Sequence, residues 1–185
     1  MDMKAGTNGK KNKAQPMDAA DTSVVIHPIA EEHIASFREC LDAVSRERRY
    51  LAFLEARPLL AIREFVLNNL RTGNPQFVAL KDNRVIGWCD VCRMDRPVYA
   101  HVGVLGMGIL KEFREQGLGR RLILATLERA REAGIERVEL TVYASNQRAV
   151  RLYESIGFAH EGIKRKGRKL DGVYEDVLMM AKLYA

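Results

Sequence analysis

Hydrophobic positions in the first third of the chain change from the two-residue period of a strand to the three- and four-residue period of a helix. Residues 23–29 (SVVIHPI) predict a first strand. A helix is expected from Glu31, because apolar residues recur behind it at Ile34, Phe37, Leu41 and Val44. A second helix is predicted from Pro58, a residue that suits a first helical turn, to Leu70.

The remaining two thirds predict six strands and two further helices. Their expected ranges are a hairpin of 76–80 and 85–92, a long strand of 98–110, a helix of 117–133, a strand of 138–142, a helix of 146–156, and a final hairpin of 158–164 and 173–183. The order βααβββαβαββ indicates one mixed α/β domain over residues 22–185. Residues 1–21 have almost no large apolar side chains and predict a flexible tail.

Composition narrows the class of protein only slightly. Hydrophobic residues make up 47% and charged residues 29% of the chain, which is ordinary for a soluble globular domain. The net charge of +6 is spread along the chain and does not argue for nucleic acid, since a phosphate-bearing small molecule explains it equally well. No apolar run reaches the length of a membrane span, and the N-terminal residues lack the apolar core of a signal peptide. We therefore expect a cytoplasmic protein with neither nucleic acid nor membrane as partner.

Three cysteines, an odd number, suit a reducing compartment. Cys89 and Cys92 form a C-x-x-C pair, but they stand on a predicted strand, where residues three apart point to opposite faces. A chelating or redox pair needs both sulfurs on one side, so we predict no metal site.

The strongest local pattern for ligand binding is R-E-Q-G-L-G-R at residues 114–120, where a predicted strand passes into a helix. Gly117 and Gly119 remove side chains at this point and expose free N–H groups at the helix start. A helix N-terminus attracts anions, and it disfavours the two arginines in its first turn by about 0.3–1 kcal/mol each. The segment therefore predicts a pyrophosphate site, with Arg114 adding positive charge. A glycine-rich helix start with solvated arginines is the alternative.

A second segment, N-Q-R-A-V-R-L-Y-E-S-I-G-F at residues 146–158, strengthens this prediction. Asn146 is a good helix N-cap. Tyr153 follows seven residues later, so two helical turns bring both side chains to one side of the helix. Taken alone, Asn146 reads as a plain cap and Tyr153 as a half-buried aromatic residue.

The two motifs together, R-x-x-G-x-G and then N-x-x-A-x-x-L-Y-x-x-x-G-F, resemble the GNAT superfamily of N-acetyltransferases. The resemblance runs from about residue 23 to the C-terminus. The closing segment, residues 161–179, is similar to the branch that acetylates small amines, amino acids or protein N-termini, including ribosomal proteins. Dimers are common in this family, which leaves a homodimer open.

The resemblance implies a mixed, mostly antiparallel sheet flanked by helices and splayed open in the middle. Acetyl-CoA is the implied co-substrate, and no metal is implied. Its pantetheine would lie along Met107, Gly108 and Ile109, and Asn146 would also contact it. The residues implied to hold the pyrophosphate are Arg114, Glu115, Gln116, Gly117, Leu118, Gly119 and Arg120.

The implied reaction is direct attack of an amine on the acetyl thioester. The departing thiolate benefits from a proton, and Tyr153 is the expected general acid. The base is left open. Related enzymes that acetylate protein N-terminal alanine carry a glutamate where Thr141 stands here, so Glu139, one strand repeat earlier, is a candidate. His101 and a water chain without a dedicated base are the other candidates.

The acceptor expected from this resemblance is a primary amine of a small molecule or amino acid. A protein N-terminus or lysine, and a noncatalytic CoA-binding module, are the alternatives. Trp88 and the first helix with Phe37, Leu41 and Tyr50 are expected as core or acceptor-pocket wall. The basic run at residues 164–169 is expected as a solvated loop. Contact with the 3′-phosphate of the cofactor and steering of an acidic substrate are the alternatives.

Overall fold

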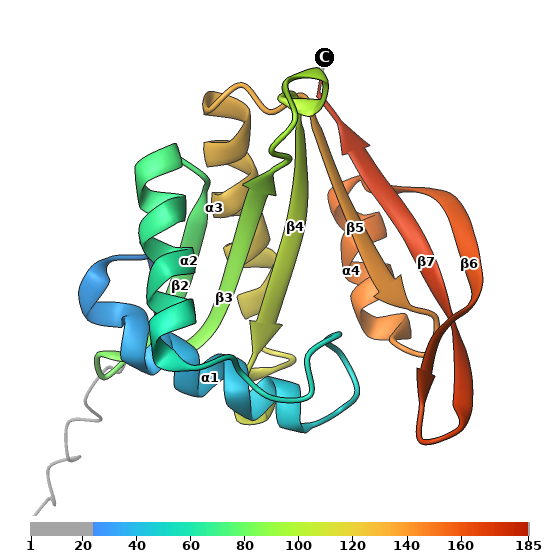
Figure 1. Cartoon of the computed structure of the whole chain (residues 1–185), viewed down its shortest axis with the longest axis horizontal. Helices are drawn as coiled ribbons and strands as arrows, with labels where there is room; N and C mark the ends of the chain where they lie inside the picture. Colours follow the sequence, from blue (N-terminus) through green and yellow to red (C-terminus); the bar gives the residue numbers. More distant parts are fainter. Residues whose placement is uncertain (1–23, 185) are drawn as a thin grey trace, which may run out of the picture.

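The computed structural model describes residues 24–184, so the tail predicted for residues 1–21 lies outside the described part. Its centre is a seven-stranded sheet in the order β1-β2-β3-β4-β5-β7-β6 (Figure 1). The strands are β1 Val25–Pro28, β2 Gln76–Lys81, β3 Arg84–Arg93, β4 Val102–Ile109, β5 Arg137–Tyr143, β6 Ala159–Leu170 and β7 Val173–Leu183. The α-helices are α1 Ile34–Arg46, α2 Leu59–Thr72, α3 Leu118–Glu132 and α4 Gln147–Ile156.

The predicted order of helices and strands is confirmed, and two boundaries were wrong. The long strand β4 begins at Val102 instead of Val98, because Pro97–Tyr99 forms a short 3-10 turn and leaves Val98 74% exposed. The basic run at residues 164–169 belongs to β6 instead of a loop. A register shift between Lys164 and Arg168 interrupts the pairing of β6 with β7 there.

The sheet carries helices on both faces, and the alternation along β3 shows which residues face which helices. Trp88 packs edge-on against Phe37 of α1, with 5.6 Å between the ring centroids. Its neighbour Gly87 faces the other way, since a Cβ there would lie 3.3 Å from the Leu122 side chain of α3. Figure 1 shows α1 and α2 in front of the sheet and α3 and α4 behind it.

Cys89 and Cys92 follow the same alternation, as the sequence predicted. Cys89 is fully buried on the α3 side, whereas the Cys92 thiol lies 3.7 Å from the Asn69 side chain of α2. Within residues 24–184, no group of three or more His, Cys, Asp or Glu side chains is placed to hold a metal ion.

The sheet opens between β4 and β5. These strands pair in parallel only from Val102 to Val104 against Arg137 to Glu139, and every other strand pair of the described sheet is antiparallel. Below this short contact the two strands diverge (Figure 1), so the lower part of β4 has a partner on its β3 side alone. The splayed sheet predicted from the family resemblance is confirmed.

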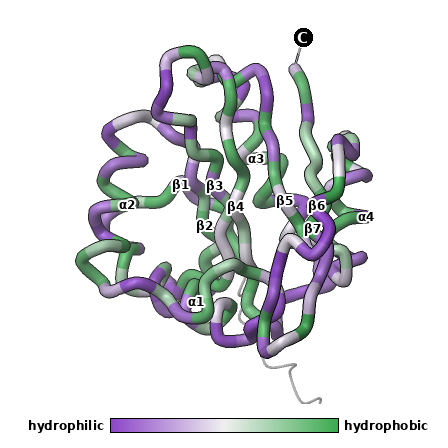
Figure 2. The backbone as a smooth tube through the Cα atoms, turned by 45° about the vertical axis from the view of Figure 1, so that its right-hand side comes forward, coloured by the Kyte–Doolittle hydropathy of each residue, from purple (hydrophilic) through white to green (hydrophobic). Residues whose placement is uncertain are grey.

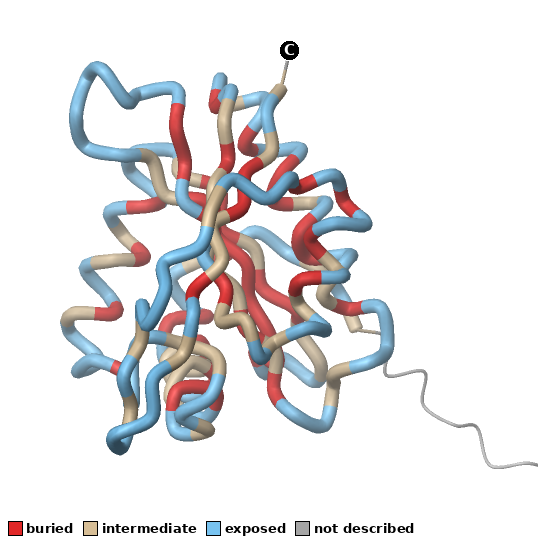
Figure 3. Tube along the Cα trace, turned by 90° about the vertical axis from the view of Figure 1, so that its right-hand side faces the viewer, coloured by how far each residue is buried: buried red, intermediate tan, exposed pale blue. Residues whose placement is uncertain are grey.

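The core lies along the central strands and under the helices. Hydrophobic residues concentrate on these strands (Figure 2), and β3 is buried along nearly its whole length (Figure 3). The fully buried side chains include Val78, Val91, Leu122, Ile123 and Val138. Because both faces of β3 are covered, the backbone of β4 beside it is held in a fixed position.

Candidate active site

A cavity of about 780 Å³ fills the opening between β4 and β5. Most of the residues predicted to bind the cofactor line it, namely Met107, Gly108, Ile109, Arg114, Glu115, Gly117, Leu118, Gly119, Arg120, Asn146 and Tyr153. Gln116 is not part of the lining, because its side-chain amide turns back and donates to the Glu112 carbonyl at 3.1 Å.

The start of α3 forms one end of this cavity. Gly117 is its N-cap residue, with a φ of 75° that favours glycine, and no side chain caps the helix. The first amide N–H groups of α3 therefore remain available to an anion. A Cβ on Gly119 would lie 3.1 Å from the Leu152 side chain and 3.4 Å from that of Ile109, so a larger residue would fill this end of the cavity.

Arg114 lines the cavity, and its side chain also has partners within the fold. Its guanidinium forms a two-pronged ion pair with Glu47, with 2.8 Å between Nη1 and Oε2, and its Nε donates to the Ile109 carbonyl at 2.8 Å. It also lies over the Tyr50 ring at 4.8 Å. These contacts fix the end of β4 to the loop after α1.

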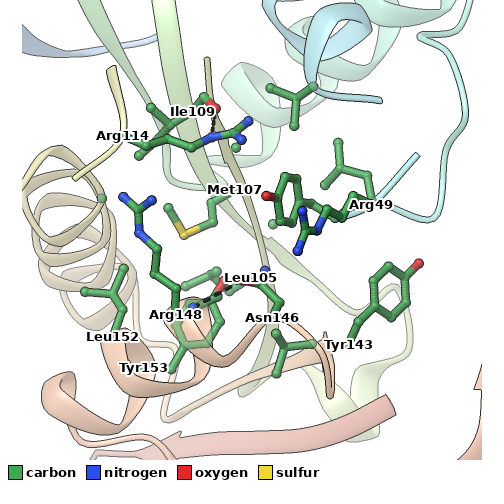
Figure 4. A pocket seen from close by; sticks show the side chains of 18 of the residues that line it. Arg49, Leu105, Met107, Ile109, Arg114, Tyr143, Asn146, Arg148, Leu152 and Tyr153 are labelled. Atoms are coloured by element: carbon green, nitrogen blue, oxygen red, sulfur yellow. Dashed lines mark hydrogen bonds between the residues drawn. The ribbon is translucent and has the colours of Figure 1, made fainter. Parts of the chain in front are cut away.

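Other arginines supply positive charge to the cavity. Arg148 in the first turn of α4 and Arg49 in the loop after α1 point into it from two sides (Figure 4). Arg148 is paired with the exposed Glu115 at 2.6 Å, and Arg120 donates to the Ser155 hydroxyl at 3.1 Å. Neither Arg49 nor Arg148 was predicted from the sequence. Arg148 stands two residues after the predicted cap and could have been found, whereas nothing in the sequence marks Arg49.

The backbone of β4 presents polar groups to the same cavity. The Leu110 N–H donates to the Ile86 carbonyl, so Leu110 and Ile86 are a hydrogen-bonded pair and their neighbours Ile109 and Gly87 are a non-bonded pair. The N–H and C=O of Ile109 consequently point away from β3; the C=O accepts from Arg114 Nε, and the N–H points into the opening. By the same alternation, the N–H and C=O of Met107 point away from β3 as well.

Asn146 and Tyr153 close the cavity from α4. The Asn146 side chain accepts from the Ala149 N–H at 3.3 Å, which confirms its role as helix cap. Tyr153 is 7% exposed and packs edge-on against Phe158 with 5.8 Å between centroids. Burial raises the pKa of the Tyr153 hydroxyl, so the hydroxyl keeps its proton at neutral pH.

The two side chains suggested as bases lie elsewhere. Glu139 stands where β4 and β5 still pair, and its carboxylate contacts Arg137 at 3.2 Å instead of lining the cavity. His101 precedes β4 at the end remote from the opening and is exposed. Neither placement supports a role as base, because a base must lie within reach of the reacting amine.

The basic run at residues 164–169 lines neither cavity described here. Its one partly buried side chain, Arg168, pairs with Glu175 at 2.8 Å and lies over the Tyr143 ring at 4.4 Å. Contact between this run and a cofactor phosphate therefore has no support from the geometry.

A second cavity, of about 280 Å³, lies on the α1 and α2 face of the sheet. Phe37, Leu41 and Trp88 line it, as expected for an acceptor-pocket wall, whereas Tyr50 lines the first cavity. Both cavities share four lining residues, Leu51, Leu105, Gly106 and Met107, so they meet along β4.

The first cavity fits acetyl-CoA. The uncapped helix start suits a pyrophosphate, the small residue at 119 leaves space for it, and the free edge of β4 offers hydrogen bonds to an extended amide chain. A splayed sheet next to such a helix start is the arrangement expected of an enzyme that transfers acyl groups from coenzyme A.

Comparison with known proteins agrees. Residues 32–158 match the acetyltransferase (GNAT) family. The L-amino acid N-acetyltransferase of Escherichia coli is 30% identical over 114 residues, which cover 61% of this chain and 70% of that protein. A GNAT-family acetyltransferase structure from Streptococcus pneumoniae superposes with a TM-score of 0.82 at 27% identity, covering 87% of this chain and 99% of that one.

Two further relatives show how varied the acceptors of similar proteins are. The [ribosomal protein bS18]-alanine N-acetyltransferase of Escherichia coli is 36% identical over 70 residues, 38% of this chain and 47% of that protein. A phosphinothricin acetyltransferase of Sinorhizobium meliloti, solved with acetyl-CoA, superposes with a TM-score of 0.82 at 16% identity, covering 87% of this chain and 88% of that one. The chain belongs to the acetyltransferase (GNAT) family.

None of the helices in residues 24–184 is long and apolar enough to cross a membrane.

Proposed function

We propose that the chain transfers an acetyl group from acetyl-CoA to the primary amine of a small molecule or an amino acid. The observation that carries this proposal is the second cavity. Its volume of about 280 Å³ falls just below the range of about 300–1,000 Å³ that is usual for drug-sized ligands, and it meets the first cavity along β4. A small acceptor can thus lie beside the place where the acetyl group would be held.

The residues of the first cavity have separable tasks in this proposal. The amides at the start of α3 hold the pyrophosphate, with Arg49, Arg120 and Arg148 around the phosphates. Acetyl-CoA supplies the acetyl group as a thioester. The Ile109 N–H, which points into the opening, suits the oxygen that becomes negative during attack. Tyr153 holds its proton at neutral pH and donates it to the departing sulfur.

The test is thiol release from acetyl-CoA, measured with a panel of amino acids, arylalkylamines, polyamines, aminoglycosides and short peptides. Acetylated products are identified by mass spectrometry. Turnover of small amines or amino acids supports the proposal. Turnover confined to peptides that model protein N-termini would replace it with the activity of the bS18-alanine relative. Tight CoA binding without any turnover would indicate a noncatalytic CoA-binding module.

A further inference from the structure

Asp90 is a buried carboxylate on β3 that none of the family motifs includes. It is 8% exposed and lines the second cavity. Most of the cavity wall is apolar and comes from α1, α2 and the loop between them, including Phe37, Leu41, Phe53 and Phe65. The other lining side chains that carry a polar or ionisable group are Arg57, Cys92 and the indole of Trp88.

The position of Asp90 on the sheet brings it to the junction of the two cavities. Asp90 pairs across the strands with Gly106, one of the four residues that line both. A Cβ on Gly106 would lie 3.2 Å from Asp90 Oδ1. The carboxylate therefore lies against the bare backbone of β4, three residues before Ile109, whose N–H points into the first cavity.

Asp90 has no basic partner within 4.0 Å among the residues that the structure describes. The Cys92 thiol lies 3.5 Å from Asp90 Oδ1 and 3.7 Å from the Asn69 amide oxygen. A buried charge is costly unless it is paired. Burial accordingly raises the pKa of Asp90 to about 7, and hydrogen bonds from Cys92 and Trp88 offset only part of this effect.

The described groups that surround Asp90 supply no buried positive charge to pair with its carboxylate. Cys92 on its own strand is a thiol whose pKa burial raises, so it remains neutral. From α2, Asn69 contributes an uncharged amide, and across β2 the partner of Asp90 is Gln76, also uncharged. Arg57, in the loop before α2, is exposed, and α1 contributes apolar side chains to this wall. A cation that enters this cavity meets one buried acid among apolar walls.

We propose that Asp90 binds the ammonium group of the acceptor and accepts its proton, and that the acceptor is a small primary amine with one apolar substituent. This inference rests on the proposed acetyltransferase function and narrows its substrate class. The apolar substituent occupies the space between Phe37, Leu41 and Phe65. Polyamines and aminoglycosides fit less well, because their additional charges would be desolvated against these walls.

The proton balance is simple. Asp90 takes one proton from R–NH₃⁺ and leaves R–NH₂, whose nitrogen forms the C–N bond as the C–S bond of the thioester breaks. Tyr153 gives its proton to the departing sulfur, and the second amine proton restores the Tyr153 hydroxyl. Asp90 later returns its proton to solvent. The net products are the acetamide, the thiol and one proton.

The experiment compares wild-type protein with Asp90→Asn, and uses Asp95→Asn, an exposed carboxylate outside both cavities, as the matched control. Acceptors are 2-phenylethylamine and L-phenylalanine against putrescine and glycine. We expect 2-phenylethylamine or L-phenylalanine to be the best acceptor, and Asp90→Asn to lower its kcat/KM by about 100-fold or more. Acetyl-CoA affinity, measured by calorimetry, should stay unchanged and shows that the variant is folded.

Two further readouts separate a proton acceptor from a structural residue. For the wild type, kcat/KM should rise with pH until Asp90 ionises near pH 7 and then level off, because the productive pair is a carboxylate and an ammonium. In Asp90→Asn the rise should continue toward the pKa of the free amine, near 10. Calorimetric binding of 2-phenylethylamine to CoA-saturated protein should weaken at least tenfold.

The inference is overturned if Asp90→Asn retains activity within about threefold of the wild type, or if putrescine or glycine is preferred to both apolar amines. Turnover by the wild type in either case leaves the proposed function standing. If the wild type acetylates no amine, while 2-phenylethylamine still binds to it and not to Asp90→Asn, the proposed function fails and the amine site is supported.

Discussion

Asp90 illustrates how a single residue can lower the stability of a fold for the sake of a binding site. An unpaired carboxylate in an apolar wall favours its protonated form, which is why its pKa lies near 7 instead of the ordinary 3.8. The folded protein therefore holds this proton between pH 3.8 and about 7, while the unfolded chain has already released it. The free energy of unfolding falls as the pH rises through this window.

Asp90→Asn should remove this pH-dependent fall in the free energy of unfolding. Because a shift of one pKa unit corresponds to about 1.4 kcal/mol, the variant should exceed the wild type in free energy of unfolding by up to roughly 4 kcal/mol at pH 8. The difference should shrink as the pH falls toward 4 and vanish well below 3.8, where Asp90 is neutral in both states. Urea denaturation at pH 5 and pH 8 measures it, with exposed Asp95→Asn as the control. A difference that does not depend on pH would contradict the assignment of a raised pKa.

Tyr153 is the second residue whose chemical role a single substitution can test. Its hydroxyl is buried and protonated at neutral pH, so removing it should affect proton transfer more than cofactor binding. We expect Tyr153→Phe to lower kcat by about 100-fold with an unchanged dissociation constant for acetyl-CoA. Tyr184→Phe is a suitable control, since the Tyr184 hydroxyl is also buried, has no hydrogen-bond partner among residues 24–184 and lines neither cavity. Equal rates for wild type and Tyr153→Phe would remove the tyrosine from the mechanism.

At the scale of elements, the start of α3 determines whether the donor can bind. Gly119 faces Leu152 of α4 across the end of the cavity, so a branched side chain there would occupy the space available to the phosphates. Gly119→Val should weaken acetyl-CoA binding by about 100-fold, equivalent to nearly 3 kcal/mol, as measured by calorimetry. Leu124→Val places the same side chain at an exposed position of α3 and should leave binding unchanged. Tight binding by Gly119→Val would show that the phosphates lie elsewhere.

The order of these elements could be predicted from sequence because each carries its own local signal. The periodicity of α1, the cap at Asn146 and the glycines at the start of α3 depend on neighbours within a few residues. Contacts between distant segments were not predicted. The ion pair between Arg114 and Glu47 joins residues 67 positions apart, and no local pattern announces it.

Asp90 was overlooked for the same reason. In the sequence it is one polar residue within an apolar strand. Its surroundings depend on α1 and α2 covering that face of β3 and on Gly106 lying opposite, and both follow from tertiary packing. For Glu139, the face of the strand was predicted correctly. The point where β4 and β5 separate could not be located from the sequence, so its distance from the cavity was not foreseen.

For the whole molecule, the opened sheet couples ligand binding to stability. The free edge of β4 and the facing part of β5 gain partners only when a ligand fills the opening. Acetyl-CoA at 100 times its dissociation constant should add about 2.7 kcal/mol to the stability of the folded state, which corresponds to a rise in Tm of about 5–10 °C for a domain of this size.

Hydrogen exchange should locate this effect. Amides of Met107, Ile109 and the end of β5 should exchange more slowly with acetyl-CoA, whereas the β2–β3 hairpin, already paired, should change little. Mass spectrometry of peptides from both regions provides the comparison. Uniform protection across the sheet would indicate global stabilisation without a bound strand-like ligand.

The junction of the two cavities at Gly106 has a consequence for the order of events during turnover. Because the donor and acceptor spaces adjoin across one strand, both substrates can be present together, and no covalent acetyl-enzyme needs to form between two half-reactions. Double-reciprocal plots of initial rate against one substrate, at several fixed concentrations of the other, should therefore intersect. Parallel lines, the signature of a ping-pong scheme, would mean that one bare stretch of β4 does not bring the two substrates face to face.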